Sequence, residues 1–166
     1  MNADLLFGRG SHLVPGRTRL SIVSTKFLAD SLDVDFFVSQ LLMELARWIS
    51  RNPKDDLQAV VMFDEADIYL PATTKPAAKG PMEGLLKRAR SGGLGIFLAT
   101  QSPGDFDYKC KENVSTLFLG KIKEKTALEK IRPMLREKTN RLPDHEAGHF
   151  HLVQGVKSLR SYPTSQ

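Results

Sequence analysis

The clearest pattern in the chain is a stripe of large apolar side chains at helical spacing between residues 33 and 52. Its members are Val34, Phe37, Val38, Leu41, Leu42, Leu45, Trp48 and Ile49. Residues spaced three and four apart lie on one face of an α-helix, so the stripe predicts a long amphipathic helix packed on a core. Asp33 or Asp35 is expected to cap its N-terminus, and Asn52-Pro53 should end it.

Two shorter runs, Gln58–Phe63 and Leu94–Ala99, are apolar at nearly every position. Continuous apolar runs of this length are typical of strands buried on both faces of a parallel sheet. An amphipathic pattern from Met82 to Ala89 separates them, with Pro81 near its start and Gly92-Gly93 at its end. A strand, a helix and a second strand in this order predict a parallel βαβ unit.

The rest of the chain extends this pattern. Residues 1–18 lack periodicity and are expected to be irregular, and residues 19–166 are expected to form one domain. The fold predicted for that domain is α/β, with a mostly parallel sheet flanked by helices and a C-terminal β-hairpin. Its further elements are strands over Arg19–Thr25 and Thr116–Ile122, a helix over Glu124–Lys138 split at Pro133, and a hairpin of His149–Val153 with Lys157–Tyr162.

Composition narrows the class of protein. The chain is 41% apolar and 26% charged, as in ordinary globular proteins, and it contains neither a membrane-spanning apolar run nor a secretory signal pattern. One cysteine, Cys110, fits a reducing compartment, so a cytoplasmic location is expected. The net charge of +5 favours an acidic partner such as nucleic acid, although a mildly basic surface without a partner explains it equally well.

Polar residues follow both predicted core strands. Asp64-Glu65 comes after the first strand and Thr100-Gln101 after the second. Because parallel strands end at the same edge of a sheet, where ligands bind, these side chains should lie close together. Asp64 could hold Mg²⁺ through water, Glu65 could orient or deprotonate an attacking water, and Gln101 could sense a γ-phosphate. The simpler alternative is an acid pair in a loop or helix cap.

The chain resembles the HerA/FtsK class of P-loop ATPases, closest to its HerA-like branch of DNA translocases and helicases. The matching segments are AVVMFDEAD (residues 59–67), KRARSGGLGIFLATQSP (87–103) and the closing GHFHLVQG (148–155). The resemblance runs from about Arg19 to the end, and it implies a partial RecA-like core that uses ATP and Mg²⁺. It also implies a hexameric ring around DNA, often beside a nuclease, with no membrane association.

The resemblance implies a role for five residues. Asp64 and Glu65 correspond to the Walker B pair, Gln101 to the sensor and Thr100 to a nucleotide contact. Arg90 corresponds to the arginine that reaches a neighbouring subunit's nucleotide, where a fixed positive charge can stabilise the transition state. The alternative for Arg90 is a basic last turn that complements the helix dipole.

The Walker A loop is missing from the sequence. That loop needs Gly-x-x-x-x-Gly-Lys followed by Ser or Thr, and the chain's one Gly-Lys pair, Gly120-Lys121, is followed by Ile122 and has Ser115 where the first glycine belongs. The isolated chain is therefore expected to hydrolyse ATP poorly or not at all. Three functions stay open: part of an ATPase motor, a non-catalytic module that docks on a full-length ATPase or on DNA, and a plain basic DNA-binding domain.

Three weaker signals remain in the sequence. Lys75 and Lys79, in a Pro/Ala/Thr/Lys loop expected to be mobile, could touch DNA. His145, His149 and His151 raise the question of a zinc site. The chain has no second cysteine, and the residues do not have the spacing of common structural zinc sites. Cys110 has no visible His/Asn partner for nucleophilic catalysis.

Overall fold

The computed structural model describes residues 2–135, 146 and 148–154. The chain divides into two compact units, Met1–Gln101 and Ser102–Gln166. The first contains helices α1 (Ala3–Phe7), α2 (Ser31–Arg51) and α3 (Lys79–Arg88) and strands β1 (Ala59–Phe63) and β2 (Leu94–Leu98). The second contains strands β3 (Thr116–Leu119) and β4 (His151–Gln154) and helix α4 (Lys125–Ile131). No described helix is long and apolar enough to cross a membrane.

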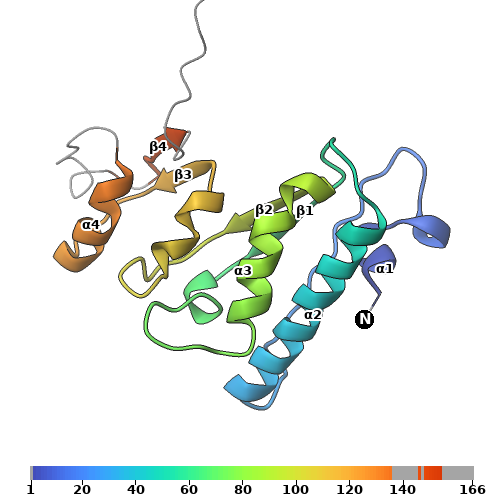
Figure 1. Cartoon of the computed structure of the whole chain (residues 1–166), viewed down its shortest axis with the longest axis horizontal. Helices are drawn as coiled ribbons and strands as arrows, with labels where there is room; N and C mark the ends of the chain where they lie inside the picture. The colour runs from blue at the N-terminus through green and yellow to red at the C-terminus, as the bar shows by residue number, and fades with distance from the viewer. Residues whose placement is uncertain (1, 136–145, 147, 155–166) are drawn as a thin grey trace, which may run out of the picture. The chain divides into compact units, whose positions relative to one another are not determined.

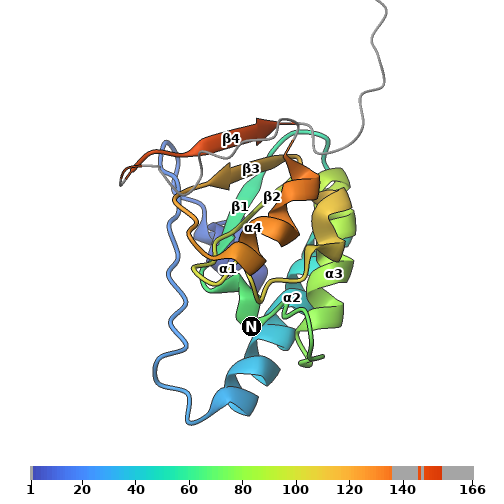
Figure 2. The same cartoon turned by 90° about the vertical axis from the view of Figure 1, so that its left-hand side faces the viewer.

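A parallel pair of strands organises the first unit. β1 and β2 pair in register from Ala59 opposite Leu94 to Phe63 opposite Leu98, and α3 forms the connection between them. Figures 1 and 2 show α2 and α3 side by side on one face of this pair. The predicted α/β fold, with a parallel sheet flanked by helices, is confirmed.

Helix α2 buries the predicted stripe but begins earlier than expected. Most of its large apolar side chains are at most 8% exposed: Val38, Leu41, Leu42, Leu45, Trp48 and Ile49. The N-cap is Asp30, whose Oδ1 accepts the backbone N–H groups of Leu32 and Asp33, each at 2.9 Å. The prediction of Asp33 or Asp35 as the cap was wrong, because Asp30 already satisfies the free N–H groups of the first turn.

Asp35 instead fixes the loop that leads into α3. Its two carboxylate oxygens accept the backbone N–H groups of Ala77 at 2.6 Å and Ala78 at 2.8 Å. Lys79 holds the same loop from within, since its Nζ donates to the carbonyl of Pro71 at 2.6 Å. The loop was expected to be mobile, but these bonds tie it down. Lys79 is only 9% exposed and does not offer the surface contact expected of it, whereas Lys75 is exposed.

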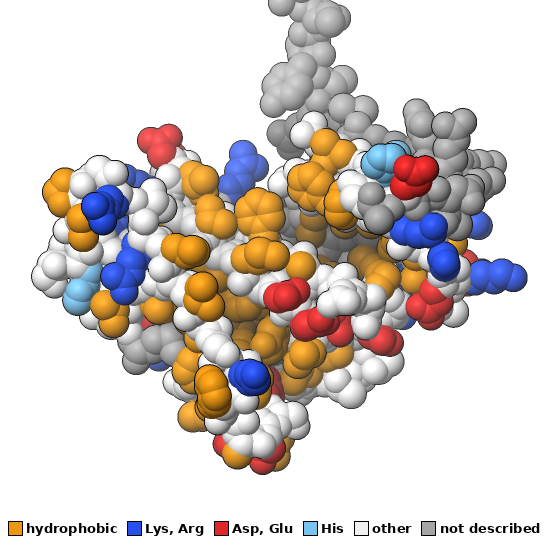
Figure 3. Space-filling model, turned by 180° about the vertical axis from the view of Figure 1, so that it is seen from behind, with side chains coloured by type: hydrophobic (Ala, Val, Ile, Leu, Met, Phe, Trp, Pro, Cys, Tyr) orange, Lys and Arg blue, Asp and Glu red, His pale blue; other side chains and the backbone are white. Residues whose placement is uncertain are grey.

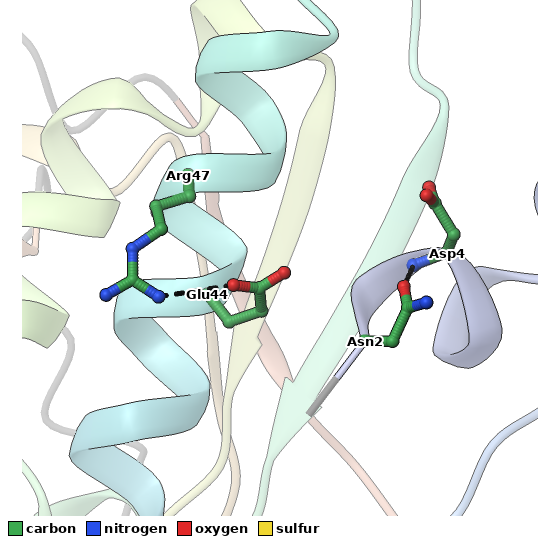
Figure 4. Close-up of polar contacts among 4 residues, drawn as sticks. All are labelled: Asn2, Asp4, Glu44 and Arg47. Carbon is green, nitrogen blue, oxygen red and sulfur yellow. Dashed lines mark hydrogen bonds and ion pairs between the residues drawn. The ribbon is translucent and has the colours of Figure 1, made fainter.

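The N-terminal segment, predicted to be irregular, contains the short helix α1. The side chain of Asn2 caps it by accepting the N–H of Asp4 (Figure 4). Asp4 then accepts the indole N–H of Trp48 at 2.9 Å, and the rings of Phe7 and Trp48 lie 4.6 Å apart. A buried indole N–H needs an acceptor, and that requirement anchors α1 on α2.

The segment Arg19–Thr25 is not a strand, contrary to the sequence prediction. It has no regular secondary structure and pairs with none of the described strands. Its apolar side chains are consequently left in solvent, with Leu20 at 83% and Ile22 at 85% exposure. β-Branched composition gives a segment the right local geometry, but a strand forms only when a neighbouring backbone supplies its hydrogen bonds.

The β1–β2 sheet is covered on one face and open on the other. Phe63 and Leu94, on the covered face, are 7% and 4% exposed. On the other face Val60 is 50%, Met62 66% and Phe97 53% exposed. The prediction that both strands are buried on both faces was therefore wrong for one face. Figure 3, which views the molecule from behind, shows hydrophobic side chains gathered at its surface.

In the second unit β3 pairs with β4 antiparallel, from Thr116 opposite Gln154 to Leu119 opposite His151. The strand expected over Thr116–Ile122 thus forms, shortened, but not in the parallel sheet. α4 ends at Ile131 and a 3₁₀ turn with Pro133 follows, as the proline predicted. A small core joins these elements: Leu119, Ile122, Ala127 and Ile131. The second half of the predicted hairpin, residues 157–162, lies outside the described residues.

Candidate functional site

The pairing of β1 with β2 continues past their last residues and brings the two polar strand ends together. The N–H of Ala99 donates to the carbonyl of Phe63 at 2.9 Å, and the N–H of Ala66 donates to the carbonyl of Ala99 at 2.8 Å. These two bonds lock the segment after β1 against the segment after β2. Asp64-Glu65 and Thr100-Gln101 therefore share the carboxyl edge of the sheet, as the sequence predicted.

Glu65 and Gln101 are joined directly. The side-chain amide of Gln101 donates from Nε2 to Oε1 of Glu65 at 2.7 Å. Glu65 has φ 49° and ψ 47°, and among the described residues it is the one non-glycine with positive φ. A left-handed conformation of this kind costs about 1–3 kcal/mol and tends to occur at functional sites. The kink ends the strand and starts a 3₁₀ turn over Ala66–Ile68.

Asp67 is a site residue to which the sequence analysis gave no role. The hydroxyl of Thr100 donates to Oδ1 of Asp67, so a second side-chain bond links the two strand ends. The signal was present in the sequence, because Asp67 is the third acid of Asp64-Glu65-Ala66-Asp67. Its partner could not be inferred, since only the turn after Glu65 brings Asp67 beside the second strand end.

Asp64 is the exposed acid of the group. One of its oxygens, Oδ1, accepts the N–H of Glu65 at 3.0 Å. The described residues contain no group of three or more His, Cys, Asp or Glu side chains that could hold a metal ion. Mg²⁺ does not require such a group, because it keeps several waters and commonly binds one or two carboxylates together with phosphate oxygens. The edge therefore fits Mg²⁺ as an ion that would arrive with a phosphate-bearing ligand.

Arg90 lies away from the other candidate residues. It is exposed in a 3₁₀ turn, Arg90–Gly92, that precedes β2, whereas Gln101 follows β2. At about 3.3 Å per residue, the five residues of β2 separate its two ends by roughly 16 Å. Arg90 thus does not join Glu65 and Gln101 within this chain.

The remaining candidates do not add to this site. Cys110 is buried and its thiol donates to the carbonyl of Asp107 at 3.2 Å, in a 3₁₀ segment of the second unit. Burial, and then the neighbouring Cys110, raise the pKa of Tyr108 to about 12. His149 and His151 lie in and beside β4, and His145 lies outside the described residues.

The fold of this chain is similar to that of proteins with solved structures. No family model matches the chain, and no curated protein matches it. Three solved structures of the genome packaging NTPase B204 from Sulfolobus turreted icosahedral virus 2 do. The complex with ATP-gammaS matches at 19% identity and a TM-score of 0.59, over 83% of this chain and 63% of that one. The complex with AMP matches at 17% and 0.56 (84% and 63%), and the complex with sulfate at 16% and 0.55 (84% and 62%).

This likeness concerns the fold. It shows that the present chain shares a fold with these solved structures over most of its own length. The chain covers less than two thirds of the length of each of these solved chains.

Proposed function

We propose that this chain supplies the hydrolytic half of an NTPase motor core of the HerA/FtsK type, with the Walker B acids and the sensor on one sheet edge. The observation that carries the proposal is the 2.7 Å bond between Gln101 and Glu65 across the two strand ends. An amide that contacts the acid and also faces the substrate links the state of the phosphate to the group that handles water.

Each residue at the edge then has a role. Asp64 would hold Mg²⁺, which would supply positive charge beside the phosphates of ATP. Glu65 orients and deprotonates the attacking water. Gln101 positions Glu65 and senses the γ-phosphate, and Thr100, held by Asp67, contacts the nucleotide. Together these residues supply the hydrolytic chemistry, but they do not include a loop that binds the triphosphate.

The phosphate-binding loop has to come from residues other than these 166, because the sequence contains no Walker A motif. In the assembly we propose, subunits form a hexameric ring on DNA, with a nuclease as a further partner. Arg90, exposed at the far end of β2, would then reach the nucleotide of a neighbouring subunit, where its charge stabilises the transition state. The genome packaging function named for B204 agrees with a DNA motor.

Magnesium-dependent ATP binding tests the proposal, measured by calorimetry on this chain alone and on a polypeptide extended by the residues encoded in frame upstream. We expect binding by the extended polypeptide and little or none by the chain alone. Turnover by the chain alone that disappears in Glu65→Gln would contradict the predicted dependence on an external phosphate grip. If neither form binds ATP, the proposal fails.

A matched pair of variants in the extended polypeptide tests the role of Glu65. Glu65→Gln should keep ATP binding and lower turnover by about 10²–10⁴-fold, the range for removal of a general base. Asp55→Asn removes an exposed acid from the loop before β1 and should leave both unchanged. Equal turnover in the two variants would exclude Glu65 as the hydrolytic acid.

The alternative is a non-catalytic module that docks on a full-length ATPase or on DNA. The absent Walker A loop and the exposed apolar face of the β1–β2 sheet favour it. It predicts no ATP binding in either polypeptide, together with stable association with an intact ATPase in size-exclusion chromatography.

A further inference from the structure

An open groove lies between the C-terminal halves of α2 and α3. Its volume is about 400 Å³, and the residues that line it are Met43, Ala46, Arg47, Ser50, Arg51 and Arg88. Five of these lie on α2 at a spacing of three and four, which places them on one face of the helix. Arg88 is the last residue of α3 and closes the other side.

The groove carries three positive charges and no negative one among its lining residues. Arg47 makes the nearest ion pair, with Glu44 at 3.3 Å, and its side chain is still 55% exposed (Figure 4). The Arg47 guanidinium therefore stays accessible to a second acceptor, although Glu44 offsets part of its charge. Arg51 and Arg88 are exposed, and Nε of Arg88 donates to the carbonyl of Gly84 at 3.2 Å. The groove is thus a concentrated positive surface on a chain of net charge +5.

Helix dipoles explain only part of this charge. Arg51 and Arg88 lie in the last turns of their helices, where a cation is favourable. Arg47 lies one turn earlier and four residues from Arg51, a spacing at which like charges repel. Arg47 and Arg51 repel each other, and Arg88 adds a third positive charge across the groove. This repulsion lowers the stability of the isolated chain, and a bound polyanion would relieve it.

The groove is also separate from the candidate catalytic edge. α2 ends shortly before β1 begins, and α3 ends shortly before β2 begins. The groove is therefore at the amino end of the parallel sheet, whereas Asp64, Glu65 and Gln101 follow the carboxyl ends of the strands. The two ends of the first unit carry opposite charge, basic at the groove and acidic at the catalytic edge.

We propose that the groove formed by Arg47, Arg51 and Arg88 binds the sugar–phosphate backbone of duplex nucleic acid without regard to sequence. Guanidinium groups bind phosphate oxygens through paired hydrogen bonds, and binding releases counterions from the duplex. The shallow, open shape suits an extended polyanion that lies across it and gives a small anion no enclosure. This surface needs no nucleotide, so it does not depend on the hydrolytic chemistry proposed above.

The test is the salt dependence of duplex binding by the whole chain. Fluorescence anisotropy with a labelled 20-base-pair duplex of mixed sequence, from about 50 to 200 mM KCl and without nucleotide, gives the slope of log affinity against log salt. In Arg51→Gln/Arg88→Gln we expect the slope to fall by about 2, or about 1 for each arginine that no longer neutralises a phosphate. Affinity at 100 mM KCl should fall several-fold.

The control variant removes the same charge elsewhere. Lys26→Gln changes one exposed lysine close to the N-terminal end of α2 and is compared with Arg51→Gln alone. A helix of 21 residues spans roughly 30 Å, so Lys26 is remote from the groove. The control should keep nearly the full slope. The proposal is overturned if the control loses as much slope as Arg51→Gln, if the double groove variant keeps the wild-type slope, or if the wild-type chain does not bind the duplex.

Discussion

The two faces of the β1–β2 sheet have similar composition but different surroundings. Phe63 and Phe97 are identical side chains at opposite faces of the same two strands, yet one is 7% and the other 53% exposed. The covered face packs against α2 and α3, whereas Val60, Met62 and Phe97 on the other face are at least half exposed. In an α/β protein a parallel sheet is normally covered on both faces.

The comparison shows how little of the sheet is needed to assemble the candidate site. One covered face and two strands suffice to hold Glu65 and Gln101 at hydrogen-bond distance, because the bonds past the strand ends lie within the strand pair itself. The open face concerns what else the first unit binds, since an exposed apolar sheet face favours association.

The largest effect should come from truncating the two phenylalanines in turn. Phe63→Ala removes a buried ring that stacks edge-on against Tyr69, with 6.2 Å between ring centroids, and should lower the free energy of unfolding by about 3–5 kcal/mol. Phe97→Ala is the matched control and should cost about 1 kcal/mol or less, because its ring is already half in solvent. Urea unfolding measures both. Similar losses in the two variants would show that the two faces are equally covered in solution.

A smaller effect should come from Asp35, which fixes the loop before α3 on the covered side. Asp35→Ala removes the acceptor of two backbone N–H bonds and should lower the free energy of unfolding by about 2 kcal/mol. The loop over residues 71–78 should also become sensitive to protease. Asp33→Ala, an exposed acid in the same helical turn, should cost about 0.5 kcal/mol and leave the loop protected. A protected loop in Asp35→Ala would mean that Lys79 alone holds it.

The smallest effect should appear at alkaline pH. Burial, and then the charge of Asp35, raise the pKa of Tyr69 above its ordinary value of 10.0. The folded state therefore favours the protonated phenol, and its stability is complete below pH 10 and declines as pH rises through the folded pKa. Tyr69→Phe should flatten this decline in unfolding measurements between pH 9 and 11. If the wild-type chain and Tyr69→Phe lose the same free energy of unfolding between pH 9 and 11, Tyr69 is not the cause of the alkaline decline.

Much of this structure follows from local sequence. The stripe from Val34 to Ile49 predicted α2, and the apolar runs before Asp64 and Thr100 predicted two strands joined by a helix. Adjacent strand ends then followed from the general geometry of parallel sheets. These predictions succeeded because periodicity and strand–helix–strand order are properties of short segments.

The failures share a different cause. Arg19–Thr25 has the composition of a strand but pairs with none of the described strands. Asp33 and Asp35 had the right residue type for an N-cap, but Asp30 caps the helix. Lys79 looked like a surface lysine and is held in a loop by the carbonyl of Pro71. In each case the outcome depended on a group distant in space or on competition between neighbours, which a local pattern does not encode.

The amino-acid sequence specified the helical stripe, the two core strands and the residue types at their ends, because side-chain periodicity and chain order are properties of the sequence. Which acid contacts which partner depended on the tertiary structure. Glu65 bonds to Gln101 and Asp67 to Thr100 because the left-handed kink at Glu65 turns the chain toward the second strand end. The tertiary structure likewise gathered Arg47, Arg51 and Arg88 around one groove, since that requires two helices to pack side by side.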